Sequence, residues 1–267
     1  MFRIIALGTN GFIPTFNRHT MSYLLMDESE EVIILDAGTG ISRLFEPQIS
    51  EIIKSKKRLN IFLSHYHLDH IIGLSYLPGL LPTKPIRLFA PSKPYVEVEA
   101  EDAVNKLLNP PLFSLSFKNY PGNTELIPVI DSEIRINGYL FQFIKLSHPG
   151  GSMGIRIDNK ICYITDTSMD QQYADFISGC GYLLHEVWMT KEEAEEKGKG
   201  ASGHSVLEDV IELSVNAGVK NLIPIHLHPK WSEEMLLNNI RMFQNEKVNI
   251  IPVTDGKMIV CENQDVG

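Results

Sequence analysis

Short apolar runs bounded mostly by turn residues dominate the first half of the chain. Their length and their content of Ile, Leu and Val predict β-strands. These predicted strands are FRIIALG (2–8), SYLLM (22–26), EVIILD (31–36), NIFLS (60–64) and IRLFA (86–90). Apolar positions within 41–58 recur with helical spacing, and Pro47 predicts a break in that helical stretch. Four Pro and Gly residues within 74–85 predict a loop.

The second half alternates between predicted strands and helices. A helix over 94–108 ends at consecutive prolines, and a helix over 205–217 begins with a capping box from Ser205 to Glu208. A helix over 233–245 starts at Ser232 and buries Met235. The strands expected here are 126–130, 133–137, 139–146, 153–158, 160–165, 182–186, 221–225, 248–253 and 257–261. This order predicts one α/β domain over residues 1–267, with mixed sheets and helices outside them.

Composition excludes several broad classes of protein. The chain has 267 residues, of which 43% are hydrophobic and 21% charged, so it can bury a folded core. Its net charge of −9 disfavours a surface for a long nucleic acid, because phosphate contacts come largely from Lys and Arg. Three widely spaced cysteines form no disulfide framework, which favours a reducing, cytoplasmic compartment. We expect no membrane-spanning segment.

Four potential metal ligands fall within six residues. They are His65, His67, Asp69 and His70, and they directly follow the predicted strand 60–64. Imidazole nitrogens and carboxylate oxygens are standard ligands of zinc and related divalent metals. Burying so many polar groups at a strand end would be costly without a metal, because each group needs a polar partner. The cluster therefore predicts a metal site.

Three further donors stand at the ends of other predicted strands: His148, Asp166 and His226. Each of them alone is compatible with an ordinary turn or strand-end residue. Taken with the first cluster, they supply five histidines and two aspartates. That number is enough for two metal ions that share a carboxylate.

This constellation resembles the metallo-β-lactamase superfamily. The motif His-x-His-x-Asp-His after a hydrophobic strand, followed in order by His148, Asp166 and His226, carries the resemblance over nearly the whole chain. Within the superfamily, SHYHLDHIIGLSYLPGLL (64–81), LLHEVW (183–188) and GVKNLIPIH (218–226) are similar to ribonuclease Z and its relatives. The resemblance implies an αββα four-layer sandwich with a dinuclear metal site at one edge of its sheets. It also implies a homodimer.

The resemblance further implies residue roles. One metal takes His65, His67 and His148, the other takes Asp69, His70 and His226, and Asp166 bridges them. The two divalent ions, Zn²⁺ first with Mn²⁺ or Fe²⁺ as alternatives, would activate a metal-bridging hydroxide. Asp69 would also accept the proton of the attacking water. His204 would be the general acid and Glu186 would orient it, although Val187-Trp188 replaces the Ala-Thr of the family segment.

Three other residues have less defined roles. Asp36 ends a predicted strand and is a candidate partner for a metal-bound histidine. His228 competes with His226 for the last ligand position. His185 lies within a predicted strand and is expected either in the core or beside a metal ligand.

The interval between His148 and Asp166 bears on the substrate. Ribonuclease Z members carry an RNA-gripping arm, which in many bacterial members lies in this interval, but here it spans only 18 positions. We therefore expect a metal-dependent phosphodiesterase for small nucleotides, with cyclic nucleotides first. The alternatives are a tRNA 3′-processing endonuclease of the ribonuclease Z type, a lactonase or thioesterase of the same fold, and a non-catalytic nucleotide-binding protein.

Overall fold

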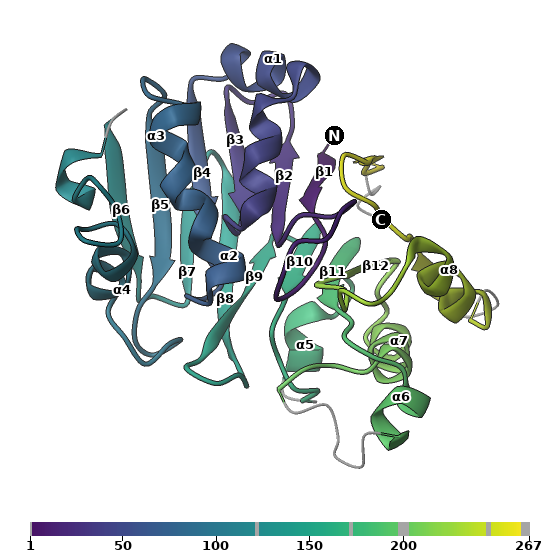
Figure 1. Ribbon diagram of the computed structural model, residues 1–267. Helices are drawn as coiled ribbons and strands as arrows, with labels where there is room; N and C mark the ends of the chain where they lie inside the picture. The colour runs from purple at the N-terminus through teal and green to yellow at the C-terminus, as the bar shows by residue number, and fades with distance from the viewer. Residues whose placement is uncertain (1, 121–122, 171–172, 197–202, 244–246, 263–267) are drawn as a thin grey trace. The chain divides into compact units, whose positions relative to one another are not determined.

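A computed structural model describes residues 2–120, 123–170, 173–196, 203–243 and 247–262 of the chain (Figure 1). The chain divides into two compact units. The first unit comprises Met1–Ile130 and Asp255–Asn263, and the second comprises Asp131–Thr254 and Gln264–Gly267. Each unit contains one seven-stranded sheet and a hydrophobic cluster of its own. The assignment of residues 1–267 to a single domain stays a prediction.

The first unit has a mixed sheet in the order β14-β1-β2-β3-β4-β5-β6. Neighbouring strands from β14 to β3 are antiparallel, and those from β3 to β6 are parallel. The strands are β1 (Arg3–Gly8), β2 (Ser22–Met26), β3 (Glu31–Leu35), β4 (Arg58–Phe62), β5 (Ile86–Pro91), β6 (Thr124–Val129) and β14 (Met258–Val260). They confirm the strands expected in the first half within one or two residues.

Helices cover one face of this sheet, and Figure 1 shows α2 and α3 in front of its parallel strands. The helical elements are η1 (Thr39–Phe45), α1 (Pro47–Ser55), α2 (Leu68–Ile71), η2 (Ile72–Tyr76), α3 (Leu77–Leu80), α4 (Ala100–Leu107) and η3 (Phe117–Asn119). The break at Pro47 is confirmed, since this proline begins α1, where a missing N–H costs nothing. Ile49 and Ile53 of α1 lie four residues apart and are buried against the sheet.

The second unit has a mixed sheet in the order β13-β12-β11-β10-β9-β8-β7. Its strands are β7 (Glu133–Ile136), β8 (Tyr139–Leu146), β9 (Ser152–Ile157), β10 (Ile161–Ile164), β11 (Tyr182–Glu186), β12 (Asn221–Ile225) and β13 (Asn249–Ile250). Its helices are α5 (Ala174–Ile177), α6 (Lys191–Glu196), α7 (Leu207–Asn216) and α8 (Glu233–Arg241). Strands β10 to β13 are parallel, and α7 and α8 pack on the sheet through residues such as Val210 and Leu236.

The parallel strands of each sheet position the polar residues of interest. Carboxyl ends of parallel strands meet at one sheet edge, where ligands commonly bind in α/β proteins. In the first unit Asp36 directly follows β3 and His65 comes shortly after β4. In the second unit Asp166 comes shortly after β10, Glu186 ends β11 and His226 directly follows β12. Each unit therefore gathers one group of candidate residues by its own topology.

Two helix predictions in the first unit need correction. The helix expected over 94–108 begins only at Ala100, because residues 92–96 form a turn around Ser92. The Ser92 hydroxyl also accepts a hydrogen bond from Ala100 N at 2.8 Å. The loop expected over 74–85 contains α3, because Pro78 occupies its first turn, where proline is tolerated.

In the second unit the prediction of a capping box at Ser205 is wrong. Helix α7 begins after Val206, which has extended backbone and no side-chain cap. The Ser205 hydroxyl donates instead to the carbonyl oxygen of Thr167 at 2.8 Å. The cap at Ser232 is confirmed, since its side chain accepts from Met235 N, but the Met235 side chain is exposed and not buried as expected. Helix α8 ends at Arg241, and part of the expected 233–245 segment lies outside the described residues.

Other expectations concern cysteines and membranes. Cys162, Cys180 and Cys261 are buried and form no disulfide among the described residues. Burial raises the pKa of the Cys261 thiol to about 12, so this thiol is an inert core group. Among the described residues, no helix combines the length and apolar character that crossing a bilayer requires.

Gly38 allows a close approach of three segments in the first unit, which gives a stability prediction. A Cβ at Gly38 would overlap the carbonyl oxygen of Asp69 and lie 2.5 Å from Thr20 Oγ1. We expect Gly38→Ala to lower the free energy of unfolding by roughly 1–3 kcal/mol through overpacking. Gly79→Ala is the matched control, because nothing lies within 4 Å of its Cβ position, and this helical alanine should add roughly 0.5–1 kcal/mol. Urea denaturation of both variants measures the difference, and equal effects would contradict the steric argument.

Candidate metal and catalytic site

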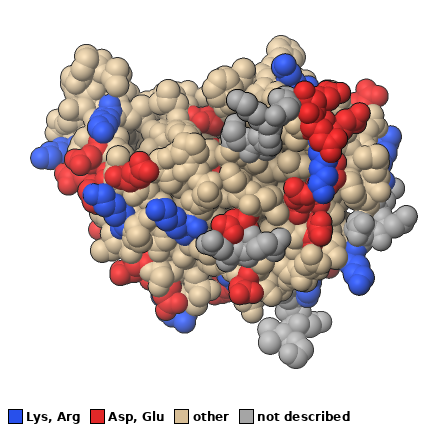
Figure 2. Space-filling model, turned by 90° about the horizontal axis from the view of Figure 1, so that it is seen from below, with Lys and Arg blue, Asp and Glu red and all other residues tan. Residues whose placement is uncertain are grey.

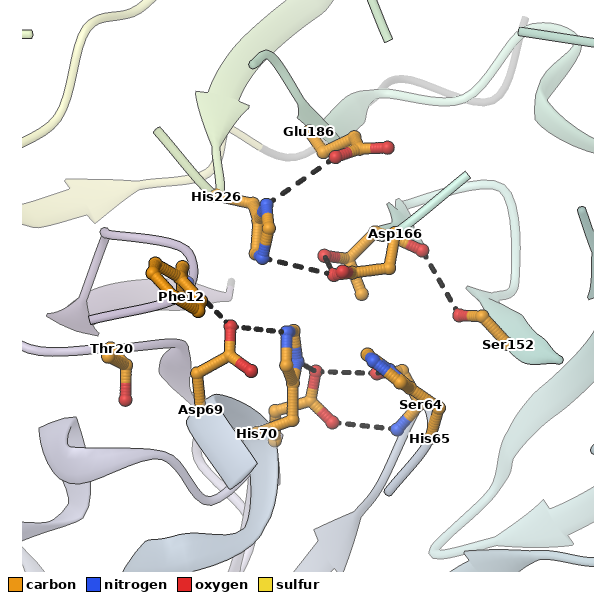
Figure 3. A network of polar contacts seen from close by, with 12 residues as sticks. Phe12, Thr20, Ser64, His65, Asp69, His70, Ser152, Asp166, Glu186 and His226 are labelled. Carbon is orange, nitrogen blue, oxygen red and sulfur yellow. Dashed lines mark hydrogen bonds and ion pairs between the residues drawn. The ribbon is translucent and has the colours of Figure 1, made fainter. Parts of the chain in front are cut away.

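In the first unit, the loop after β4 and the start of α2 bring three histidines together. The rings of His65 and His67 have centroids 4.6 Å apart, and those of His65 and His70 are 4.3 Å apart. His65 and His70 are buried, whereas His67 is exposed. Asp69 joins this group, with its Oδ2 3.4 Å from His70 Nε2 and 2.7 Å from the backbone N–H of Phe12, which donates to it (Figure 3).

Asp36 fixes the ring orientation and tautomer of two of these histidines. Its carboxylate is fully buried and accepts from His70 Nδ1 at 2.7 Å, from Ser64 N at 2.7 Å and from the Ser64 hydroxyl at 2.8 Å. Because a carboxylate only accepts, His70 Nδ1 carries the proton. The Ser64 hydroxyl donates its proton to Asp36. The Ser64 oxygen therefore accepts a hydrogen bond from His65 Nδ1 at 3.0 Å. Both rings therefore leave the Nε2 lone pair available for a metal ion.

In the second unit, Asp166 lies between two histidines. His148 Nε2 is 3.5 Å from Asp166 Oδ1, and His226 Nε2 is 3.2 Å from Asp166 Oδ2. The carbonyl oxygen of Gly203 lies 3.0 Å from His148 Nδ1 and can only accept, so this ring also has Nε2 as its ligand atom. Ligand atoms of Asp166, His204 and His226 lie within 4.8 Å of one another. The second unit thus holds a His/Asp cluster able to bind a metal ion.

Glu186 and His204 form a hydrogen-bonded pair beside this cluster. Glu186 is completely buried, and its Oε2 accepts from His204 Nδ1 at 2.8 Å and lies 3.4 Å from His226 Nδ1. Thr167 N donates to the other carboxylate oxygen at 2.6 Å. Burial alone would raise the pKa of Glu186, but its hydrogen bonds with His204 and His226 hold that pKa below its ordinary value. Glu186 is therefore an ionised acceptor that orients both rings.

Trp188 stacks on the His204 ring. Trp188 is one of the two residues, with Val187, that replace the Ala-Thr of the family segment. The Trp188 and His204 rings stack with centroids 4.7 Å apart and an interplanar angle of 23°. Trp188 also contacts His228, with ring centroids 4.5 Å apart. His228 Nδ1 accepts from Lys230 N at 3.1 Å, and His228 is in none of the potential metal groups found among the described residues. The geometry therefore favours His226 over His228 as the ligand.

Three of the site residues adopt a backbone conformation that the sequence does not reveal. Asp36 has φ of 57°, and Asp166 and His226 each have φ of 49°. This left-handed region is uncommon for residues other than glycine, and such strain clusters at functional sites. Each of these residues follows a strand, so the chain turns away there while the side chain stays at the sheet edge. No sequence signal indicated this, because none of the three is glycine.

The sequence predicted nine residues at the site. Within each unit, the structure brings the predicted residues of that unit together. The first unit brings together His65, His67, Asp69 and His70, and the second brings together His148, Asp166, Glu186, His204 and His226. The donor set fits divalent metals, because several imidazoles have Nδ1 held by an acceptor and Nε2 left as the ligand. Asp36 is confirmed as a histidine partner and His185 as a core residue.

Sequence reasoning missed three groups that position these residues. The Ser64 hydroxyl links Asp36 to His65, and the Phe12 amide binds Asp69. The third is the Gly203 carbonyl, which holds His148. Ser64 stands next to the histidine motif, so adjacency could have suggested it. The other two contacts join residues far apart in the chain and had no local signal.

Asp36→Asn tests the tautomer argument. The asparagine amide would donate toward His70 Nδ1, which favours the tautomer with its proton on Nε2 and removes the ligand lone pair. We expect metal affinity to fall by roughly 10–100-fold, measured by competition with a chelator. Asp158→Asn is the matched control, because Asp158 also has positive φ and accepts a backbone N–H but contacts no histidine in the part of the chain described. Equal affinity in the two variants would refute the tautomer role of Asp36.

A comparison of the sequence with known protein families identifies one matching family. The family model described as "Beta-lactamase superfamily domain" matches residues 31–227, which span the candidate residues of both units. The chain belongs to the β-lactamase superfamily. Its fold is the metallo-β-lactamase fold, an α/β fold in which two mixed sheets carry helices.

Three relatives illustrate the similarity. Ribonuclease Z of Methanococcus aeolicus is 25% identical over 93% of this chain and 90% of the relative. The metallo-β-lactamase fold protein YhfI from Bacillus subtilis superposes with a TM-score of 0.75 at 18% identity, covering 97% of this chain and 98% of that one. A diphosphatase from the PhnP family superposes with a TM-score of 0.69 at 17% identity, covering 98% of both chains. The ribonuclease and the diphosphatase are hydrolases by name.

Proposed function

We propose that this chain is a dinuclear-metal-dependent phosphodiesterase that hydrolyses small nucleotides, with cyclic nucleotides as the first candidates. The observation that carries the proposal is the Glu186–His204 pair, which lies beside the cluster of Asp166 and His226. An alkoxide leaving group needs a proton in the transition state, and an oriented imidazolium can supply it. A lactonase or thioesterase of the same fold would have less need of this pair.

We propose seven residues as ligands of the two ions. They would be His65, His67, Asp69 and His70 of the first unit and His148, Asp166 and His226 of the second. The donor chemistry supports this assignment, because imidazole and carboxylate suit Zn²⁺ and also Mn²⁺ and Fe²⁺. We propose Zn²⁺ as the resident ion, and metal analysis of the purified protein tests both its identity and the number of two per chain.

The chain's own residues would divide the reaction between them. Bound divalent metals supply Lewis acidity, which makes water a nucleophile at neutral pH and stabilises charge on phosphoryl oxygens. Asp69, which the Phe12 amide holds in place, accepts a proton from the attacking water. His204 donates a proton to the departing alkoxide oxygen. Glu186 keeps His204 oriented, because its buried carboxylate accepts from His204 Nδ1 at 2.8 Å.

Three observations support a small substrate. In the second unit β9, a turn and β10 fill the interval between His148 and Asp166 and leave no room there for an RNA-gripping arm. The alignment with the Methanococcus ribonuclease Z is 309 residues long, longer than this 267-residue chain, so the relative carries insertions that this chain lacks. On the face in Figure 2, Lys and Arg side chains alternate with Asp and Glu and form no continuous basic surface.

A second candidate function is tRNA 3′-end processing. The observation in its favour is the similarity to ribonuclease Z, which extends over 93% of the chain. It requires that another surface replaces the arm. We also propose a cytoplasmic location, which the buried free cysteines support, and a homodimer, which sedimentation velocity tests.

Hydrolysis of three substrates side by side tests the proposal. Metal-reconstituted protein is given bis(p-nitrophenyl) phosphate, a panel of 3′,5′-cyclic and cyclic oligonucleotides, and a 3′-extended precursor tRNA. We expect turnover of a cyclic nucleotide and an intact RNA. Trimming of the RNA with inert cyclic nucleotides would replace the first function by the second. Binding of nucleotides without any turnover would instead indicate a non-catalytic sequestering protein.

A further inference from the structure

The segment between β1 and β2 exposes three large apolar side chains within five residues. Phe12 is 70% exposed, Ile13 45% and Phe16 fully exposed. A single exposed apolar residue needs no explanation, but several on one short segment are typical of a binding surface. The exposure of these three side chains therefore indicates a binding surface.

Hydrogen bonds within this segment and to Asp255 hold its backbone in place. Asn10 Nδ2 donates to Thr15 Oγ1 at 3.1 Å, and the Asn10 oxygen accepts from the buried Arg18 at 3.2 Å. Thr15 N donates to the Arg18 carbonyl at 2.8 Å. Asp255 accepts from the backbone N–H of Thr9 at 3.1 Å and of His19 at 2.6 Å, so one carboxylate fastens both ends of the segment. The apolar side chains thus project from a fixed frame.

The backbone of this segment also contacts the candidate site through Phe12. Phe12 has φ of 65°, a conformation that is costly for a bulky residue and persists only when its surroundings enforce it. In that conformation its N–H donates to Asp69 Oδ2 at 2.7 Å, as Figure 3 shows. The exposed Phe12 ring therefore belongs to the residue that directly contacts a carboxylate of the proposed metal site.

We infer that Phe12 and Phe16 form the stacking surface for the base of the nucleotide substrate. This inference rests on the proposed function and names the part of the substrate that these residues recognise. Bases stack on aromatic side chains through their faces, whatever the base, and exposed aromatics in a rigid frame lose little entropy on binding. A phosphate bound near Asp69 carries its base attached, and the aromatic segment begins at the residue bonded to that carboxylate.

The experiment compares two substrates that differ only in the base. One is adenosine 3′,5′-cyclic monophosphate, and the other is the same cyclic phosphate of 1-deoxyribose, with hydrogen in place of adenine. For each variant the base preference is kcat/KM for the nucleotide divided by kcat/KM for the base-free analogue. Phe12→Ala and Phe16→Ala should each lower this preference by about 5- to 140-fold, which converts about 1–3 kcal/mol of stacking per base. Phe45→Ala is the matched control, because Phe45 is 67% exposed elsewhere in the first unit.

A binding measurement without metal adds a second readout. In the Phe16→Trp variant, stacking of adenosine 5′-monophosphate should quench the fluorescence added by the new indole, and in the Phe45→Trp variant it should not. An unchanged base preference in Phe12→Ala and Phe16→Ala, with the wild type still active on both substrates, would overturn the stacking surface and leave the proposed function standing. A change from dimer to monomer on sedimentation, with base preference unchanged, would assign the segment to self-association instead. Inactivity of the wild type on both substrates would overturn the proposed function itself.

Discussion

Replacing His226 with alanine should lower phosphodiester hydrolysis by at least about 10³-fold, since a bound metal supplies several kcal/mol of transition-state stabilisation. His226 Nε2 lies 3.2 Å from Asp166 Oδ2, and its side chain is buried. The variant should also bind fewer metal ions, because it lacks one of the proposed metal ligands. Metal content by mass spectrometry and kcat/KM for a cyclic nucleotide measure the two effects together.

His228→Ala is the matched control for this change. His228 lies two positions further along and contacts Trp188, but its Nδ1 accepts from Lys230 N and it lies in none of the potential metal groups among the described residues. We expect this variant to keep its metal content. Loss of metal from His228→Ala, with retention in His226→Ala, would exchange the roles of the two histidines.

Replacing His204 with alanine should slow the cleavage of a cyclic nucleotide by roughly 10²–10⁴-fold, as expected for the loss of a general acid. The leaving group of that substrate is an alkoxide, which departs poorly without a proton. Bis(p-nitrophenyl) phosphate releases p-nitrophenolate, a stable anion, so its hydrolysis should fall much less. The ratio of the two rates therefore reports proton donation.

Metal content decides between two roles for His204. Its ligand atom lies within 4.8 Å of those of Asp166 and His226, so the geometry would also allow it to bind a metal. As a general acid, His204 can be removed with both metals retained, and Glu186→Gln should produce the same dependence on the leaving group. Loss of metal from His204→Ala, or equal slowing of both substrates, would contradict the role of acid.

Much of the site could be predicted because its signals are local. The candidate ligands between His65 and His70 fall within six residues directly after a strand, and His148, Asp166 and His226 follow strand ends that apolar runs mark clearly. Parallel strands then gather Asp166 and His226 at one edge of the second sheet, whereas His148 follows β8, whose neighbours β7 and β9 are antiparallel to it. The pairing of Glu186 with His204 came from family resemblance, and the 2.8 Å contact confirms it.

The failures had tertiary causes. The Ser205 hydroxyl donates to the Thr167 carbonyl, which lies 38 positions away, and helix α7 begins only after Val206, so Ser205 does not accept from the first helical N–H groups. The exposure of the aromatic residues Phe12 and Phe16 had no signal in the sequence. The positive φ values of Asp166 and His226 follow from the sheet-edge geometry and not from their residue types.

The division of the chain into units has a consequence for its synthesis. Residues 131–254 carry every described strand and helix of the second unit, whereas the first unit needs β14 (Met258–Val260) in addition to its first 130 residues. A ribosome therefore releases every strand of the second sheet before β14 can pair with β1. Until then β1 presents an open sheet edge, and Asp255 cannot yet fasten the segment that carries Phe12. The sheet that begins first is completed last.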